Sequence, residues 1–268
     1  MVHIIFLFIF NLFANLEKKQ PIIISFTTID SRINFIKPMI ESLLNQTLKP
    51  DNINLYISDE VGVLNKGINP KMIPDFIKIM VNEKNINLIY TKDIGPHTKL
   101  IPCLKENWGK DCVIITVDDD RIYPTNFVEA LYKNYLEQNC VICYRANKIK
   151  FRNNNLLKIQ KYRTWPKARE KDLFNFAKGV DGVLYKPEFF TQEVFNIDAI
   201  NQCCPKADDV WFNFTRIIKK IPVFKIPEKL SISSVDIPNK IELFSTNIVD
   251  NGYQIIKTLK HLKKNNLL

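Results

Sequence analysis

The segment that decides the fold is Val113-Ile114-Ile115-Thr116-Val117-Asp118-Asp119-Asp120-Arg121, in which an apolar, β-branched run ends in three consecutive carboxylates. Such a run predicts a strand that is buried on both faces, as in a parallel sheet. In open α/β sheets, ligands bind at the carboxyl ends of the strands, which is where these acids fall. Adjacent carboxylates repel one another unless a cation binds, and oxygen ligands suit Mg²⁺ or Mn²⁺ together with phosphates. The segment therefore predicts a metal–phosphate site, with an acidic turn after a strand as the alternative.

Strand and helix patterns alternate on both sides of this segment. Apolar strand-like runs and helical periods follow one another, with strands at 21–28, 53–57, 86–90, 113–117 and 141–144 and helices at 31–44, 74–81, 98–104 and 127–136. This order is typical of an α/β fold with a doubly wound, mostly parallel sheet. Right-handed crossovers then place the ends of the parallel strands on one edge. A further strand is predicted at 180–185, and a further helix opens at Ala207-Asp208-Asp209.

Composition narrows the class of protein. The 268 residues are 46% hydrophobic and 25% charged, which is ordinary for a globular domain. Only 7 glycines occur, and neither GxxxxGK[ST] nor GxGxxG is present, which argues against P-loop and dinucleotide-binding folds. The net charge of +10 favours an anionic partner. No nucleic-acid-binding module is recognisable, so we expect no nucleic acid among the partners.

The six cysteines indicate a reducing compartment. Cys140 and Cys143 have CxxC spacing, but a zinc site needs a second matching pair, and the adjacent Cys203-Cys204 does not supply one. Thiols in apolar runs pack as small hydrophobic side chains. We therefore expect a cytoplasmic protein, with peripheral membrane association as an open alternative.

Three regions are predicted along the chain. Residues 1–20 form an apolar segment that is too short for a spanning helix, which leaves a weak anchor, a packed helix or a leader as alternatives. Residues 21–225 form the main domain, with a nucleotide-binding half at about 21–120 and an acceptor half at about 121–225. Residues 226–268 form a tail in which 255–262 predict a basic amphipathic helix. That helix either lies on an anionic membrane or docks on its own domain, and we favour docking.

The motifs of residues 21–225, taken together and in order, resemble those of GT-A glycosyltransferases, close to the family 2 type. They are Thr27-Thr28-x-x-Ser31-Arg32, Asp59, Gly95-Pro96-His97-Thr98-Lys99-Leu100, Val117-Asp118-Asp119-Asp120, Gly179-Val180-Asp181-Gly182 and Ala207-Asp208-Asp209. The resemblance implies a GT-A fold, a nucleotide-sugar donor, a divalent metal and, usually, inversion at the anomeric carbon. It also implies a glycosyltransferase, most simply one that transfers a hexose.

The resemblance assigns the donor side of the site. Asp118 and Asp120 are two residues apart on an extended segment, so we expect their side chains to share a side, with Asp120 ligating Mn²⁺ or Mg²⁺ and Asp118 reaching the metal or the ribose. Lys99 is expected in the first turn of its helix, where it suits a phosphate or a nucleotide carbonyl, although a surface lysine is the alternative. The other residues expected at the nucleotide or the donor sugar are Thr27, Thr28, Arg32, Asp59, Asp119 and Gly182.

The catalytic base is expected in the pair Asp208-Asp209, with Asp209 as the first choice. An inverting transfer needs a base on the acceptor side of the anomeric carbon, and the resemblance places that carboxylate here. Helix capping is the alternative, because Asp is favoured near a helix start. His261 is the only late histidine and stands in an unlikely position for a metal ligand. Trp165 and Trp211 either stack on a sugar or belong to the core.

Three hypotheses for function remain. The first is a metal-dependent, inverting glycosyltransferase that moves a sugar from a UDP- or GDP-sugar to a glycan, lipid-linked or protein acceptor. The second is a nucleotidyltransferase that makes an activated sugar, although Thr27-Thr28-Ile29-Asp30 lacks the Gly-rich basic loop that this class would need. The third is a non-catalytic carbohydrate-binding relic of the fold. Acceptor choice lies in irregular segments that carry no readable code.

Overall fold

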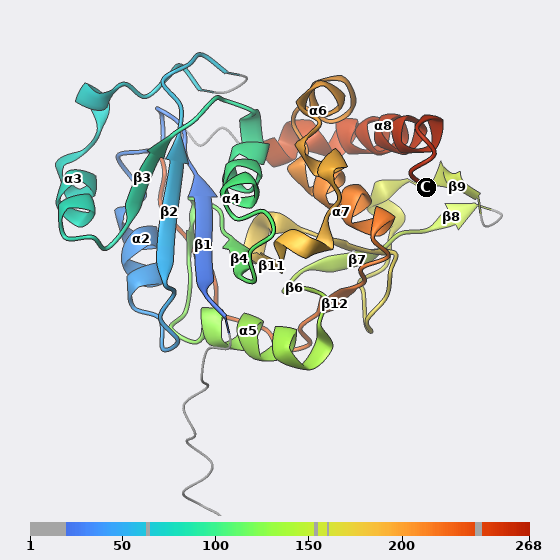
Figure 1. Ribbon diagram of the computed structural model, residues 1–268, viewed down its shortest axis with the longest axis horizontal. Helices are drawn as coiled ribbons and strands as arrows, with labels where there is room; N and C mark the ends of the chain where they lie inside the picture. Colours follow the sequence, from blue (N-terminus) through green and yellow to red (C-terminus); the bar gives the residue numbers. More distant parts are fainter. Residues whose placement is uncertain (1–19, 63–64, 153–154, 160, 239–242) are drawn as a thin grey trace, which may run out of the picture.

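A seven-stranded sheet forms the centre of the computed structural model, which describes residues 20–268 except 63–64, 153–154, 160 and 239–242. The strand order is β12-β6-β11-β4-β1-β2-β3 (Figure 1). The strands are β1 (Ile22–Thr27), β2 (Asn52–Ile57), β3 (Asn87–Tyr90), β4 (Val113–Thr116), β6 (Val141–Cys143), β11 (Val183–Tyr185) and β12 (Val223–Lys225). All neighbouring strands pair in parallel except β11, which runs antiparallel to both β4 and β6. The doubly wound, mostly parallel α/β sheet predicted from the sequence is confirmed.

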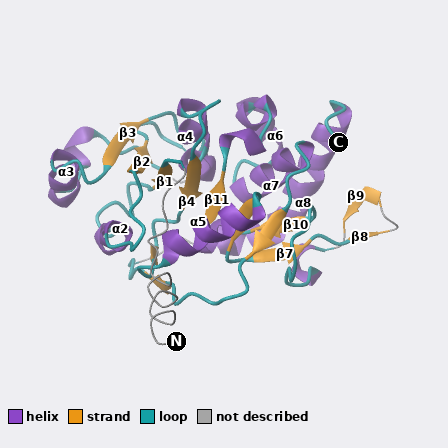
Figure 2. Cartoon of the chain, turned by 60° about the horizontal axis from the view of Figure 1, so that its bottom comes forward, coloured by secondary structure: helices purple, strands orange, loops and turns teal. Residues whose placement is uncertain are grey.

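Helices and short ladders surround this sheet. Figure 2 shows α5 lying across the strands, where it packs on β6 and β11. The helices are α2 (Lys37–Leu44), α3 (Asp75–Asn82), α4 (Ile101–Glu106), α5 (Phe127–Gln138), α6 (Ile197–Cys203), α7 (Asp208–Ile218) and α8 (Leu243–Lys264). The small ladders are β5 (Arg121–Ile122) with β13 (Ser233–Ser234), β7 (Ala146–Lys148) with β10 (Asn175–Ala177), and β8 (Phe151–Arg152) with β9 (Asn155–Ile159). Single 3₁₀ turns include η3 (Gly95–Lys99), η4 (Tyr162–Thr164), η5 (Gly179–Asp181) and η7 (Gln192–Phe195).

Two helices begin later than the sequence pattern predicts. The first was expected from Ser31, yet residues 30–35 form turns and α2 begins only at Lys37. The second was expected from Thr98, yet that residue lies in η3 and α4 begins at Ile101. Each helix carries a proline in its first two positions. Proline lacks an N–H and has a φ suited to the first turn, so it favours a helix start at that point.

The predicted strand at 180–185 is shorter than expected and runs in the opposite direction to its neighbours. Residues 179–181 form η5, and Gly182 then adopts a φ of 88°. That left-handed conformation turns the chain into β11, which begins at Val183. A side chain at Gly182 has no room, because an added Cβ would lie 2.4 Å from Cζ of Phe127.

The segment expected to be a tail takes part in the fold. Within it, β13 pairs with β5, and α8 spans 22 residues, well beyond the predicted 255–262. Helix α8 packs against α6 and α7 (Figure 1), and Ile255, Leu259 and Leu262 on it are buried. Docking on its own domain is therefore confirmed for this helix, although Ile256, next to these residues, is 37% exposed.

The expectations for the cysteines, for Trp165 and Trp211 and for the N-terminal segment have different outcomes. All six cysteines are buried free thiols, as expected for small hydrophobic side chains. Trp165 and Trp211 are also buried, and the indole of Trp211 donates to the carbonyl of Val194, so both belong to the core. The three alternatives for the apolar N-terminal segment concern residues that, except for Gln20, lie outside the described part of the chain. Among the described helices, none combines the length and apolarity needed to cross a membrane.

We predict that Gly182→Ala destabilises the protein by about 2–4 kcal/mol, because the new methyl group overpacks against Phe127 and the backbone conformation is strained. Urea unfolding would measure the loss. Gly252→Ala in α8 is the matched control, since nothing lies within 4 Å of its added Cβ. Alanine favours a helix, so the control should be neutral or more stable by up to about 1 kcal/mol. Equal effects of the two variants would contradict the packing argument.

Candidate active site

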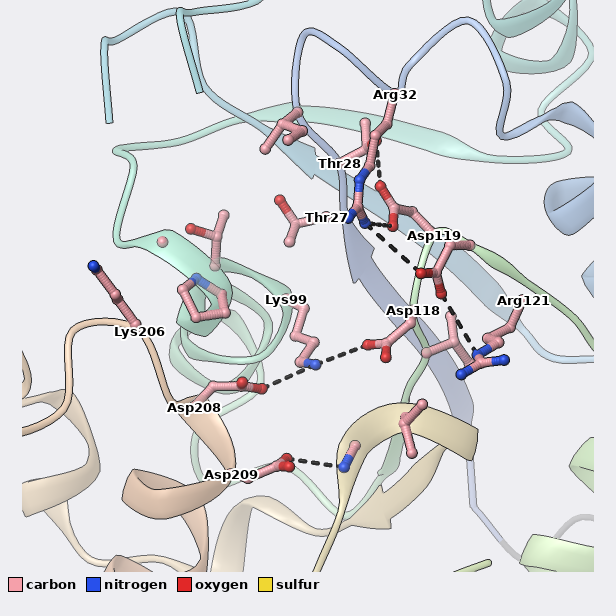
Figure 3. Close-up of a pocket in the computed structure, with 18 of the residues that line it drawn as sticks. Thr27, Thr28, Arg32, Lys99, Asp118, Asp119, Arg121, Lys206, Asp208 and Asp209 are labelled. Atoms are coloured by element: carbon pink, nitrogen blue, oxygen red, sulfur yellow. Dashed lines mark hydrogen bonds and ion pairs between the residues drawn. The ribbon is translucent and has the colours of Figure 1, made fainter. Parts of the chain in front are cut away.

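A cavity of about 460 Å³ lies at the carboxyl ends of β1 and β4. The turns η3 and η5 and the first residues of α7 complete its wall. Among the residues predicted from the sequence, nine line this cavity: Thr27, Thr28, Arg32, Lys99, Asp118, Asp119, Asp120, Asp208 and Asp209. Figure 3 shows the labelled members of this group converging from segments that lie far apart in the sequence. The structure therefore brings the donor-side and acceptor-side predictions into one site.

Lys99 joins the two groups of acids. Its Nζ lies 2.9 Å from Asp118 Oδ1 and 2.9 Å from Asp208 Oδ2 (Figure 3). The Ser25 hydroxyl holds the backbone by donating to the Lys99 carbonyl at 2.6 Å. Burial alone would lower the pKa of Lys99, but the carboxylates of Asp118 and Asp208 raise it well above its usual range. Lys99 is therefore a buried cation, and the surface-lysine alternative is wrong, as is its placement in the first turn of a helix.

Asp118 and Asp120 do not share a side in the way the sequence suggested. The chain leaves its extended conformation after β4 and turns at 119–120. Asp118 faces Lys99, and its amide donates to the Tyr123 hydroxyl at 2.9 Å. Burial opposes ionisation of Asp118, yet the Lys99 ammonium lowers the pKa of this carboxyl. Asp120 instead lies 3.6 Å from Arg121 Nε and 3.9 Å from Arg32 Nη1.

Asp119, the middle acid, has partners on both carboxylate oxygens. Arg32 Nη1 donates to Oδ1 at 2.8 Å, and the Thr28 hydroxyl donates to Oδ2 at 2.7 Å. Burial raises the pKa of Asp119 even though Arg32 opposes the rise. Asp119 thus ties the loop after β1 to the turn after β4. This contact fixes Arg32 at the cavity wall.

Asp208 and Asp209 are the first two residues of α7, but neither caps it. The N-cap is Ala207, without a side-chain cap, so the capping alternative is wrong in its strict form. Asp209 Oδ1 accepts the Gly179 N–H at 2.9 Å. Burial, followed by the charge of Asp208, raises the pKa of Asp209 to about 8. A carboxylate with so high a pKa is a stronger proton acceptor than an ordinary aspartate.

Two of the predicted donor residues lie outside the cavity wall. Asp59 is exposed after the end of β2 and does not line the cavity. Gly182 is separated from it as well, and its missing side chain makes room for Phe127. His97, in the same motif as Lys99, is fully buried, and its ring contacts the ring of Phe212. His261 bonds Glu193 at 2.7 Å and is not among the lining residues.

Several residues of the wall were not predicted from the sequence. They are Ser58, Asn65, Asp93, Arg121, Arg145, Tyr162, Lys178, Gly179, Lys206 and Asn251, together with apolar neighbours. Lys178 precedes the Gly179 motif and Arg121 follows the acidic triplet, so adjacency alone was a usable signal for these two. Arg145 and Tyr162 come from the irregular basic segment, and Asn251 comes from α8. For these three, no sequence pattern indicated a shared site.

Metal binding remains a prediction for this site. In the part of the chain that the structure describes, no three or more His, Cys, Asp or Glu side chains form a group that could hold a metal ion. The oxygens of Asp118 and Asp120 do line the cavity, and carboxylate oxygens are the donors that Mg²⁺ and Mn²⁺ prefer. The donor chemistry therefore fits, provided that phosphate groups and water supply the remaining ligands.

We expect Lys99→Met to destabilise the protein by about 3 kcal/mol, because it leaves two largely buried carboxylates without their cation. Asp208→Asn should recover part of this loss in the double variant, with a coupling of about 1–3 kcal/mol measured by urea unfolding. Lys186→Met is the matched control, since its partners Asp111 and Glu188 lie at the same 2.9 Å but are exposed. Strictly additive effects of Lys99→Met and Asp208→Asn would contradict the bridge.

The raised pKa of Asp209 predicts a pH-dependent cost to stability. Between about pH 4 and pH 8 the folded protein retains a proton that the unfolded chain loses, so this residue's contribution falls as the pH rises through its folded pKa. The free energy of unfolding of Asp209→Asn, relative to that of the wild type, should therefore increase by on the order of 1–3 kcal/mol between pH 5 and pH 8.5. Chemical denaturation across this range tests the prediction, and a pH-independent difference would refute it.

No protein-family model matches the sequence, and a search among curated proteins finds no match. Similar folds do occur among solved structures. S. aureus TarS 1–349 in complex with UDP-GlcNAc aligns over 85% of this chain and 61% of that chain, at 14% identity and a TM-score of 0.49. Another structure of S. aureus TarS 1–349 aligns over 79% of this chain and 59% of that chain, at 15% identity and a TM-score of 0.47.

A third similar structure is 4-diphosphocytidyl-2C-methyl-D-erythritol synthase from Anaerococcus prevotii, which aligns over 86% of this chain and 93% of that chain at 12% identity and a TM-score of 0.47. The chain spans about three fifths of the TarS 1–349 structures. Identities and TM-scores this low assign no activity. The chain's own features show a mostly parallel α/β sheet with the acidic segment at the end of its central strand β4, as the sequence resemblance implied.

Proposed function

We propose that this chain is a transferase that uses a nucleotide-diphosphate sugar, and specifically an inverting, metal-dependent glycosyltransferase. The observation that carries the proposal is the Lys99 bridge, which brings Asp118, beside the acidic turn, and Asp208, beside the candidate base, to 2.9 Å from one ammonium. A donor-binding group and a proton acceptor must lie within one cavity for a sugar to pass between two substrates. The bridged acids meet that requirement.

On the donor side, the cavity matches a charged diphosphate. Arg32 and Arg121 supply cationic donors next to Asp120, and the Thr27 and Thr28 side of β1 supplies polar contacts for the nucleotide. Guanidinium groups bind phosphate oxygens in paired hydrogen bonds. Asp120, assisted by Asp118, would hold Mn²⁺ or Mg²⁺. When bound, such an ion neutralises the leaving diphosphate as a Lewis acid.

On the acceptor side, Asp209 is the proposed base. Its carboxylate would accept the proton of the acceptor hydroxyl while the hydroxyl oxygen attacks the anomeric carbon from the face opposite the departing diphosphate, so the configuration inverts. The Gly179 amide fixes one carboxylate oxygen and leaves the other for the substrate. Lys99 fixes Asp208 beside it. The acceptor would be a glycan, a lipid-linked sugar or a protein.

The test is thermal unfolding with UDP-, GDP- and CDP-sugars, each with and without Mn²⁺. We expect one nucleotide to raise the midpoint in the presence of Mn²⁺, because a ligand at 100 times its Kd stabilises the native state by about 2.7 kcal/mol. UDP-GlcNAc, the compound bound to TarS, is a suitable first donor. Asp120→Asn should lose the Mn²⁺-dependent part of the rise, whereas Asp75→Asn, an exposed acid on α3, should keep it.

The remaining outcomes separate the alternatives. A Mn²⁺-independent rise would contradict the metal assignment while retaining a nucleotide site. Release of pyrophosphate from a nucleoside triphosphate and a sugar 1-phosphate would favour the nucleotidyltransferase. No rise with any nucleotide sugar, in folded protein, would refute the proposed donor and favour a relic of the fold.

A further inference from the structure

The basic side chains of the cavity differ in whether an acid already neutralises them. Arg32 pairs with Asp119, and Lys99 pairs with Asp118 and Asp208. Lys178 also lines the cavity, yet no carboxylate of a described residue lies within ion-pair distance of its ammonium. A half-buried cation without an anionic partner is costly, because it gives up hydration without a compensating charge.

The surroundings of Lys178 reinforce this contrast. Its ammonium lies 5.5 Å from the centre of the Tyr162 ring, which can orient a cation but does not neutralise it. Burial lowers the pKa of Lys178; the nearby charge of Asp209 opposes this shift, and the positive charge of Arg145 adds to it. An anion bound at this point would stabilise both cations. Among the described residues, Lys178 is thus a cation of the cavity wall that has an acid nearby but makes no ion pair with it.

Backbone contacts place Arg145 beside Lys178 at the same wall. The Lys178 amide donates to the Arg145 carbonyl at 2.8 Å, which continues the β7–β10 ladder by one step. The Arg145 side chain pairs with Asp181, but 55% of it remains exposed, and it lines the cavity as well. Two basic side chains therefore flank the end of this ladder.

The position of Lys178 assigns this basic wall to the acceptor side. Its neighbour Gly179 donates to the carboxylate of Asp209, the proposed base. Arg32 and Asp120, the proposed donor contacts, lie at the loop after β1 and the turn after β4. A group bound by Lys178 is thus next to the hydroxyl from which Asp209 would take the proton.

We infer that the acceptor carries an oxyanion, a phosphate or a carboxylate, close to its reacting hydroxyl, and that Lys178 with Arg145 binds this group. The inference rests on the proposed function, because it takes Asp209 as the acceptor-side base. It deepens that function by naming an acidic acceptor class. Neutral sugars would lack the charge that these two side chains select.

The experiment measures binding of three small probes to the full chain by isothermal titration calorimetry: methyl glucoside, glucuronate and glucose 6-phosphate. Saturating UDP with Mn²⁺ is present throughout, so that the donor subsite is filled and cannot take up the phosphate. We expect one or both anionic probes to bind roughly tenfold more tightly than methyl glucoside, as charge-assisted hydrogen bonds permit. The stronger of the two identifies phosphate or carboxylate as the group.

Variants of Lys178 and of a distant lysine show whether the preference for the anionic probe depends on this wall of the cavity. Lys178→Met should remove the preference for the anionic probe, and Lys178→Arg should restore it. Lys219→Met, an exposed lysine after α7, removes the same net charge away from the cavity and should keep the preference. Circular dichroism melting checks that each variant is folded. Loss of the preference in Lys219→Met to the same extent would overturn the assignment to this wall.

Failure of this inference differs from failure of the proposed function. If UDP binds but both anionic probes bind no better than methyl glucoside, the acidic acceptor is wrong and the nucleotide site stands. If UDP and the other nucleoside diphosphates fail to bind the folded wild type, the proposed function fails first and takes this inference with it. A preference that survives in Lys178→Met would also overturn the inference.

Discussion

The buried ammonium of Lys99 is the constraint on which the site depends. Two carboxylates, Asp118 after β4 and Asp208 at the start of α7, lie far apart in the sequence and meet at this one cation. Without it they would repel each other across a water-poor space, and the cavity could not keep them close. The same cation leaves Asp209 as the neighbouring acid whose charge is held less firmly, since burial and Asp208 raise its pKa. One lysine thereby divides adjacent acids into an ion-paired residue and a residue able to accept a proton.

Much of the fold was predictable because its signals are local. The uninterrupted apolar run of β4, the alternation of strands with helical periods and the position of the acidic triplet all depend on neighbouring residues. The direction of β11 was not predictable in this way. It depends on pairing with β4 and β6, strands that lie far from it in the chain. The late starts of α2 and α4 were readable from Pro38 and Pro102, but the apolar periodicity outweighed that signal.

The site residues that the sequence predicted best lie directly at the end of a strand or at the start of a helix. The acids after β4 and at the start of α7, the threonines after β1 and Lys99 all line one cavity. Their mutual geometry was less predictable, because a tight turn at 119–120 separates Asp118 from Asp120. Arg145, Tyr162 and Asn251 were not predicted. They lie in irregular segments and in a helix that is distant in the sequence, and hydrophobic periodicity does not indicate which cavity such residues line. The part of the cavity wall that these three residues form is therefore the part that the structure adds to the sequence analysis.

The strand order has a consequence for how the chain is made. Strands β1 to β4 pair among themselves and are complete by residue 116, yet the second edge of β4 pairs with β11, which begins only at Val183. During synthesis this edge, formed by Val113–Thr116, therefore stays unpaired while more than sixty further residues emerge. An open strand edge that is rich in apolar, β-branched residues readily joins another copy of itself. Strand β4 places Asp118, Asp119 and Asp120 at the cavity. The same strand is thus a segment through which the nascent chain depends on protection from aggregation.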